Sequence, residues 1–96
     1  MASYRLSRKA AADLEAIATY TIEQFGIDQA RRYRDSLGSR FEQLVESPKL
    51  GRRAEQLARG LRRLDHESHI VFYTVENDDV LIVRILHSHM DVSKRF

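Results

Sequence analysis

The residue types best suited to chemistry lie near the end of the chain, in the segment RILHSHMD that runs from Arg84 to Asp91. An aliphatic run carries Arg84 and then gives way to His87, His89 and Asp91. Imidazoles titrate near neutral pH, so they serve as acids, bases or metal ligands. The segment therefore leaves three alternatives open: a metal site, an acid–base site, or a contact surface where a strand ends.

A metal site has the least support of the three. The pattern HSHMDV looks superficially like the H-x-H-x-D-H signature of metallo-β-lactamase-type hydrolases, but Val92 replaces the final histidine and that fold needs a far longer chain. Zinc requires about four ligands in tetrahedral geometry, or three and a water. The only other histidines, His66 and His69, belong to a different strand or turn, and there is no cysteine. We expect no metal and no cofactor.

Other hydrolytic chemistries are also weakly supported. The serines occur at a helix cap, in turns and within a helix, without the glycine-flanked elbow of a nucleophile. Glycosidase chemistry needs two inward-facing carboxyl groups. The available acids are expected in turns or loops, namely Glu67, Glu76, Asp78 and Asp79.

RNA cleavage is the best catalytic alternative. Attack by the 2′-hydroxyl needs a base, an acid and cations for the developing phosphorane charge. Arg62, Arg63 and Arg84 lie on adjacent predicted strands and supply cations, while His87, with His89 as a second candidate, titrates in the right range. No glutamate lies beside them, however, and no tyrosine follows the last strand. If the protein is a ribonuclease, its catalytic residues are Arg62, Arg84 and His87; otherwise the arginines serve a surface contact.

The basic residues are unevenly distributed although the net charge is only +2. Five arginines lie within a dozen positions: Arg52, Arg53, Arg59, Arg62 and Arg63. A cluster of this kind attracts phosphate or an acidic protein partner. The alternative is a solvated surface that only favours solubility, and composition does not choose between them.

The length and composition indicate one soluble globular domain spanning residues 1–96. No stretch approaches the roughly 18 apolar residues of a membrane span, and no apolar block follows the basic N-terminus as in a signal peptide. We therefore predict a cytoplasmic protein without a membrane partner.

Two helices are expected in the first half of the chain. Tyr4–Leu6 alternate like a short strand, and Ser7 is a good N-cap for a helix from Arg8 to Phe25 that Gly26 ends. We expect Asp28 to cap a second helix that stops at Ser47-Pro48. The short connection predicts an antiparallel hairpin. Its apolar stripes are Leu14, Ile17, Ala18, Thr21, Ile22 and Phe25, then Ala30, Tyr33, Leu37, Phe41, Leu44 and Val45.

The second half reads as strands. Residues 48–60 form a loop with turn signals, followed by strands at Leu61–Asp65, Ile70–Glu76 and Val80–Leu86, the last two joined by a tight turn at residues 76–79. The order β-α-α-β-β-β predicts an α+β fold: an antiparallel sheet with the N-terminal helical hairpin packed on one face.

Alternation along the last strand predicts which of its side chains lie on each face of the sheet. Val80, Ile82, Arg84 and Leu86 share one side, with Leu81, Val83 and Ile85 on the other. Burial of an unpaired arginine is costly, so we expect the end of the sheet near Arg84 to be open to solvent or a ligand. The second face is too apolar for open water, and we expect a partner to cover it.

Several segments, in this order and spacing, resemble one known family. They are YRLSRKAAADLEAIATYT, FGIDQARRY, SPKLGRR followed by GLRRL, SHIVFYTV, and VRILHSHMD. The chain resembles over nearly its whole length the ParE toxins of the RelE/ParE superfamily, from bacterial type II toxin–antitoxin modules. The resemblance implies the same β-α-α-β-β-β layout.

What the resemblance implies about function divides in two. ParE-type members bind DNA gyrase without catalysis of their own, whereas RelE-type members cut mRNA on the ribosome. The long helical hairpin, the LH…MD ending and the lack of a lysine-rich sheet match the ParE side better. The resemblance therefore implies a gyrase inhibitor that is not an enzyme and meets nucleic acid only indirectly. The alternative, a ribosome-dependent mRNA endonuclease, rests on Arg62 and Arg84 near nuclease cations and His87 near a terminal acid.

The resemblance also implies a ParD-like antitoxin, whose disordered C-terminal segment folds along the toxin in a hetero-oligomer. The apolar excess on the strands and exposed members of the helix stripes suit a helix-in-groove or strand-addition contact, and the arginines suit acidic groups on a partner. The predicted partner-binding residues are Tyr20, Tyr33, Arg53, Arg59, Arg62, Arg63, Arg84, His87 and Met90.

Overall fold

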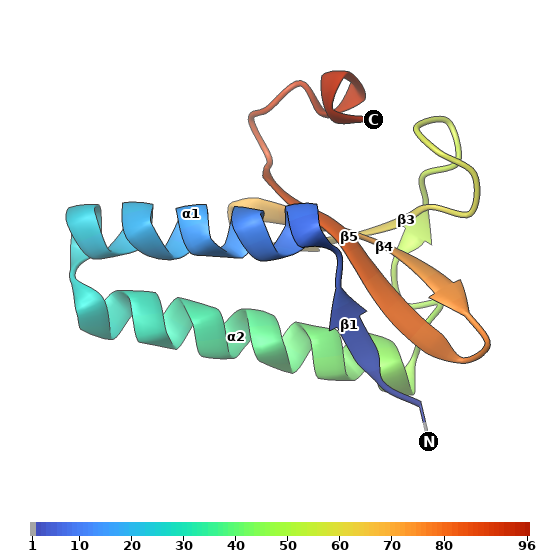
Figure 1. The fold of residues 1–96 in the computed structure, drawn as a ribbon, viewed down its shortest axis with the longest axis horizontal. Coiled ribbons are helices and arrows are strands. Elements are labelled where there is room, and N and C mark those ends of the chain that lie inside the picture. The colour runs from blue at the N-terminus through green and yellow to red at the C-terminus, as the bar shows by residue number, and fades with distance from the viewer. Residues whose placement is uncertain (1) are drawn as a thin grey trace.

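A computed structural model describes residues 2–96, and the elements follow the predicted order. Figure 1 shows α1 and α2 side by side as an antiparallel hairpin against the strands. Within residues 2–96 neither helix combines the length and apolar character that a membrane crossing requires. The elements are β1 (Tyr4–Leu6), α1 (Arg8–Phe25), α2 (Ile27–Glu46), β2 (Arg52–Arg53), β3 (Arg62–His66), β4 (His69–Glu76), β5 (Asp79–His87) and a 3-10 turn, η1 (Val92–Arg95).

The five strands form one sheet in the order β1-β5-β4-β3-β2. The α+β class is confirmed, but the sheet is mixed: β1 pairs parallel with β5, and the other three pairs are antiparallel. Parallel neighbours need a long connection, which the helical hairpin and the intervening strands provide. The short strand β2 lies in the region predicted as a loop.

Local capping chemistry sets the helix ends. Ser7 has extended backbone angles, and its hydroxyl accepts the Ala10 N–H at 3.0 Å, as predicted for an N-cap. Gly26, with φ of 91°, ends α1 and also begins α2. The predicted cap at Asp28 is wrong, because Asp28 lies inside the first turn of α2. Its carboxylate there complements the positive end of the helix dipole.

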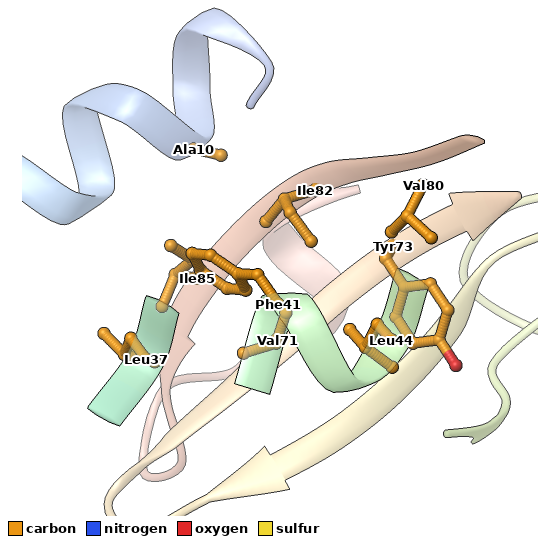
Figure 2. Packing of buried hydrophobic residues seen from close by; sticks show 9 residues of the cluster. All are labelled: Ala10, Leu37, Phe41, Leu44, Val71, Tyr73, Val80, Ile82 and Ile85. Atoms are coloured by element: carbon orange, nitrogen blue, oxygen red, sulfur yellow. The ribbon is translucent and has the colours of Figure 1, made fainter. Parts of the chain in front are cut away.

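The main core lies between the helical hairpin and the sheet. Figure 2 shows its side chains converging from α1, α2, β4 and β5. They are Ala10, Leu37, Phe41, Leu44, Val71, Tyr73, Val80, Ile82 and Ile85. The predicted stripe of α1 holds only in part: Thr21 is buried, but Ile22 and Phe25 are 45% and 67% exposed. The turn end of the hairpin therefore carries apolar side chains that the core does not use.

A β-bulge changes which residues of β5 face the core. Ile82 lies opposite Tyr73, whereas Arg84 lies opposite the adjacent Phe72, so Val83 is the extra residue. The bulge reverses the predicted alternation beyond Val83. Ile85 therefore joins Val80 and Ile82 in the main core, and Leu86 packs on the other face, with Ile70 and Phe72.

The second face of the sheet is covered by the chain itself, so the expectation that a partner covers it is wrong. Ala54 and Leu61 pack there against Phe72 and Leu86. Phe96, from the C-terminal segment, places its ring centroid 4.9 Å from that of Phe72. Ala54, Leu61, Phe72 and Leu86 belong to a second buried cluster, and Phe96 lies at its exposed margin. Figure 1 shows the loop before β3 and the C-terminal segment.

Candidate functional site

A groove of about 540 Å³ lies between the turn end of the helical hairpin and the strand ends at His69 and His87. Its exposed apolar wall includes Tyr20 and Phe25, which are 61% and 67% exposed, and Met90, which is 42% exposed. We call this region the hairpin groove. It is lined by Ala16, Ile17, Tyr20, Thr21, Phe25, Gln29, Tyr33, Glu67, Ser68, His69, His87 and Met90.

Aromatic and imidazole rings meet at one side of the hairpin groove. The Tyr33 hydroxyl hydrogen-bonds His69 Nδ1. His69 lies opposite His87 in the β4–β5 register, with 5.4 Å between their ring centroids. His89 continues the row at 5.1 Å from His87. His66, in β3, places Nε2 3.0 Å from Ser36 Oγ on α2.

Burial keeps this side of the groove neutral. It lowers the pKa of His69, and the nearby imidazoles of His87 and His66 lower it further. Burial also lowers the pKa of His66 and raises the pKa of the Tyr33 hydroxyl. At neutral pH these three residues are therefore uncharged, which suits the groove to an apolar occupant.

Arg84 is held by a carboxylate rather than open to a ligand. Its Nε and Nη2 each donate to an oxygen of Asp13, on α1, at 2.8 Å. Both side chains are largely buried, at 16% and 14% exposed. The hydrogen bond to Asp13 raises the pKa of Arg84 above its ordinary value. The expectation that the sheet is open at Arg84 is wrong, because its positive charge is neutralised within the fold.

The other predicted arginines lie at the β2–β3 edge of the sheet. Arg62 Nε donates to the Gly51 carbonyl at 3.2 Å, and Arg63 Nη2 donates to Asp65 at 3.2 Å. Arg53 is exposed, with 3.9 Å between its Nη1 and a Glu55 oxygen. Arg59 is exposed in the loop that precedes β3.

The three residues of the nuclease alternative do not converge. Arg62 lies opposite Tyr73 and His87 opposite His69, so the two positions are four residues apart along β4. That spacing is about 13 Å along a strand. Arg62 and Arg84 are also engaged with Gly51 and Asp13. The structure instead brings together Tyr20, Tyr33, His87 and Met90 in the hairpin groove.

Sequence reasoning missed two important residues. Asp13 was not predicted to have any role, although a lone arginine in an aliphatic strand is a signal that an acid elsewhere in the chain pairs with it. Phe25 was placed on the inward stripe, but it forms part of the groove wall. Within residues 2–96, no group of three or more histidine, aspartate or glutamate side chains is placed to hold a metal ion.

Residues 4–92, from β1 to the start of η1, match the family model described as the ParE toxin of the type II toxin–antitoxin system parDE. The chain belongs to this toxin family. It is 43% identical over 91 residues to Toxin ParE1 of Caulobacter vibrioides, covering 95% of this chain and 94% of that relative. It is 36% identical over 92 residues to Toxin ParE1 of Mycobacterium tuberculosis strain H37Rv, with the same coverage.

Two further comparisons agree with this ParE assignment. Toxin ParE of Escherichia coli is 33% identical over 96 residues, which cover 99% of this chain and 93% of that protein. A solved structure described as the chromosomal ParDE TA system from P. aeruginosa superposes with a TM-score of 0.77 at 26% identity. That superposition covers 91% of this chain and 96% of the other. The predicted family and fold are both confirmed.

Proposed function

We propose that this ParE-family toxin inhibits DNA gyrase in the cytoplasm through protein–protein contact, with no catalysis of its own. We further propose that a ParD-like antitoxin neutralises it by seating an amphipathic segment in the hairpin groove. The hairpin groove is the observation on which the proposal rests, because it offers a preformed apolar surface that the fold does not fill.

The chemistry of the groove supports a protein occupant. Tyr20 and Phe25 are large aromatic side chains on an exposed helix surface, the type that dominates binding energy at protein interfaces. An amphipathic helix or strand docks by placing alternate apolar anchors in such a groove. Tyr33 and His69 add polar atoms that are neutral at pH 7, so covering them does not desolvate a charge.

The positions of the basic residues support action through protein–protein contact rather than through RNA cleavage. A phosphoryl-transfer centre needs an acid, a base and a cation within hydrogen-bond reach of one reacting group. Arg84 is neutralised by Asp13, and Arg62 lies about 13 Å from His87 along the strand direction. The family relationship supports the same reading, since the matching relatives are named as ParE toxins.

A pair of substitutions at the hairpin turn tests the groove. Phe25→Asp places a charge in the groove wall, and Ile27→Asp places one on a similarly exposed apolar residue that does not line the groove. The partner is the antitoxin encoded beside this toxin, and calorimetry measures its affinity. We expect Phe25→Asp to weaken binding at least about 30-fold, as for an interface hot spot, and Ile27→Asp to change it less than about fivefold.

Thermal unfolding of both variants shows whether the fold survives. Equal losses of affinity in the two variants, or no loss in Phe25→Asp, would place the antitoxin elsewhere. A parallel supercoiling assay with purified gyrase tests the target: wild-type toxin should inhibit the reaction, and prior addition of antitoxin should restore it. Undiminished supercoiling at saturating toxin would contradict gyrase as the target.

A further inference from the structure

The strands β2 and β3 form a ladder in which every pair consists of two arginines. Arg52 lies opposite Arg63, and Arg53 lies opposite Arg62. Directly opposed residues in an antiparallel pair have Cα atoms about 4.5–5.5 Å apart, and like charges there destabilise the sheet. Two pairs of like charges are therefore attached at adjacent positions of the ladder, an arrangement that folding alone disfavours.

Few acids compensate this charge. Residues 49–65 contain six basic and two acidic side chains, a net charge of +4, whereas the rest of the chain is net −2. The two acids, Glu55 and Asp65, contact Arg53 at 3.9 Å and Arg63 at 3.2 Å. Both acid side chains are at least half exposed, so these pairs are weak and solvent-screened. The region attracts anions from solution.

Protection of the sheet edge does not explain the ladder. Charged residues on an edge strand prevent edge-to-edge aggregation, and β2 is such an edge. That role needs charges only on β2, yet Arg62 and Arg63 belong to β3, one strand further in. Arg63 Nε is buried without a hydrogen-bond partner among the described residues, so the structure bears a further cost at this arginine.

The pleat of the ladder indicates which anion fits. Neighbouring residues on a strand point to opposite faces, so Arg52 and Arg63 face one side and Arg53 and Arg62 the other. On its other side β3 is paired with β4, so the arginines form a charged sheet edge rather than a free ribbon. Duplex DNA carries one negative charge per about 1.7 Å of helix axis, a denser array of phosphates than a single strand presents. Arginines at such an edge can contact a phosphate backbone that lies along it, and guanidinium groups bind phosphate in a bidentate manner.

An acidic peptide fits this surface less well. Peptide ligands depend on apolar anchors, and the exposed large apolar residues of this chain are concentrated elsewhere, on the helical hairpin and near the C-terminus. Leu50, which is 48% exposed, is the one described beside the ladder. A phosphate backbone needs only cations and donors, and the sequence pI of about 9.2 is within the range typical of nucleic-acid-binding domains.

We propose that the arginine ladder of β2 and β3 is a binding surface for the phosphodiester backbone of duplex nucleic acid, separate from the hairpin groove. The contact is to phosphates and therefore independent of base sequence. This goes beyond the proposed function, in which the toxin meets nucleic acid only through gyrase. It also stands independently of that function, because the toxin alone binds the duplex.

Fluorescence anisotropy of a labelled 20-base-pair DNA duplex with purified toxin tests the proposal. We expect binding that weakens as salt rises, with a slope of about −3 to −4 in log K against log salt, as about four phosphate contacts predict. The variant Arg52→Glu/Arg53→Glu should lose at least about tenfold in affinity. Its matched control is Arg31→Glu/Arg32→Glu, which makes the same charge change at exposed positions of α2 and should stay within about threefold.

Each other outcome counts against the proposal. No duplex binding at low salt, or equal losses in the two double variants, would show that the ladder is no site. Tighter binding of a labelled polyglutamate peptide than of the duplex would assign the ladder to an acidic protein. Stronger binding of single-stranded RNA would contradict the preference for the denser charge of a duplex. Circular dichroism confirms that both variants remain folded.

Discussion

At the scale of single residues, Asp13 joins α1 to the free edge of β5. Strand β1 pairs with β5 only as far as Ile82, so the next edge groups of β5 lack a strand partner. Ser7 donates its hydroxyl to the Val83 carbonyl at 2.7 Å, and Asp13 accepts the Ile85 N–H at 2.9 Å as well as both bonds from Arg84. The N-cap and first two turns of α1 thus complete the hydrogen bonding that the short strand leaves unfinished.

Replacing Asp13 by alanine should be strongly destabilising. The change leaves Arg84 largely buried without its counter-ion and the Ile85 N–H without an acceptor. Removing one partner of a buried pair costs about 3 kcal/mol or more of unfolding free energy. The control is Asp35→Ala, which breaks an exposed pair with Arg34 and should cost less than about 0.5 kcal/mol. Urea denaturation measures both, and equal effects would refute this role for Asp13.

The histidines near the hairpin groove should make stability depend on pH. The pKa values of His66 and His69 are lower in the folded protein than the unfolded value of about 6.5. Below pH 6.5 the unfolded chain therefore binds more protons, so the free energy of unfolding falls as pH falls. His87 lowers the pKa of His69 further, and Arg40 does the same for the pKa of His66. Glu67 opposes the effect, because it raises both pKa values. The stabilisation is fully present above pH 6.5.

A thermal titration checks this sign. The melting temperature of the wild type should decline from pH 7.5 to pH 5.0, and His69→Gln should decline less because one titrating group is gone. His89→Gln, at an exposed position, should decline as the wild type does. A wild-type protein whose melting temperature rises toward pH 5 would show that protonation favours the folded state.

The residue scale is where sequence reasoning was least complete. Tyr33, Leu37, Phe41 and Leu44 were placed on the inward stripe of the second helix, and Leu37, Phe41 and Leu44 lie in the main core with Tyr33 packed against it. The pairing of Asp13 with Arg84 joins positions 71 residues apart, and no spacing rule links them. The exposure of Phe25 also escaped prediction, because helical periodicity gives a direction around the helix but not where the opposing layer ends.

At the scale of elements, Tyr73 fixes the loop between α2 and β2. Its ring is fully buried in the core, and its hydroxyl donates to the Pro48 carbonyl at 2.7 Å and accepts the Gly51 N–H at 2.9 Å. A Cβ at Gly51 would lie 2.5 Å from the Arg63 carbonyl and 2.6 Å from the Tyr73 hydroxyl. The close approach that places β2 beside β3 therefore requires glycine at this position.

Two glycine substitutions test the requirement for glycine at position 51, one at that position and one as a control. Gly51→Ala should destabilise the protein by about 2 kcal/mol or more, because backbone must move to relieve the overlap. Gly38→Ala lies within α2 with open space around its Cβ, and it should stabilise by about 0.5–1 kcal/mol through higher helix propensity. Urea unfolding of both variants gives the sign of each change in the free energy of unfolding. An unchanged free energy of unfolding in Gly51→Ala would contradict the proposed close packing.

Elements were predictable where their signals are local. Ser7, Gly26 and the Ser47-Pro48 pair mark helix ends within one residue of those observed, because capping and the pre-proline restriction act on adjacent residues. The bulge at Val83 was not predictable, since every residue around it is aliphatic or arginine and either face accepts the aliphatics. The strand β2 was missed because two arginines carry no strand signal without their partners in β3.

At the scale of the whole molecule, two surfaces of different chemistry lie apart on one small fold. The hairpin groove is largely apolar, and it lies at the end of the sheet that carries His69 and His87. The arginine ladder lies on the outer two strands, at the level of Tyr73. This separation allows an apolar protein segment and a polyanion to bind without competing for the same side chains.

The overall class and family were predictable from the order of elements and the motifs along the chain, because these are distributed over nearly the whole length. The functional surfaces were less predictable from the sequence. Tyr20, Tyr33, His87 and Met90 are brought together only by the packing of the hairpin on the sheet. The predicted arginines instead divide among an internal ion pair at Arg84, the edge ladder and, for Arg59, the loop before β3.

The most direct test of action by protein contact is to induce the toxin and measure two products in the same cells. Trapped gyrase–DNA cleavage complexes are quantified beside new 5′ ends of mRNA mapped by primer extension, for the wild type and for His87→Ala. If the toxin acts by protein contact, cleavage complexes should accumulate in both strains without new codon-placed mRNA ends. Codon-placed mRNA ends that appear with normal gyrase activity, and that vanish in His87→Ala, would contradict it.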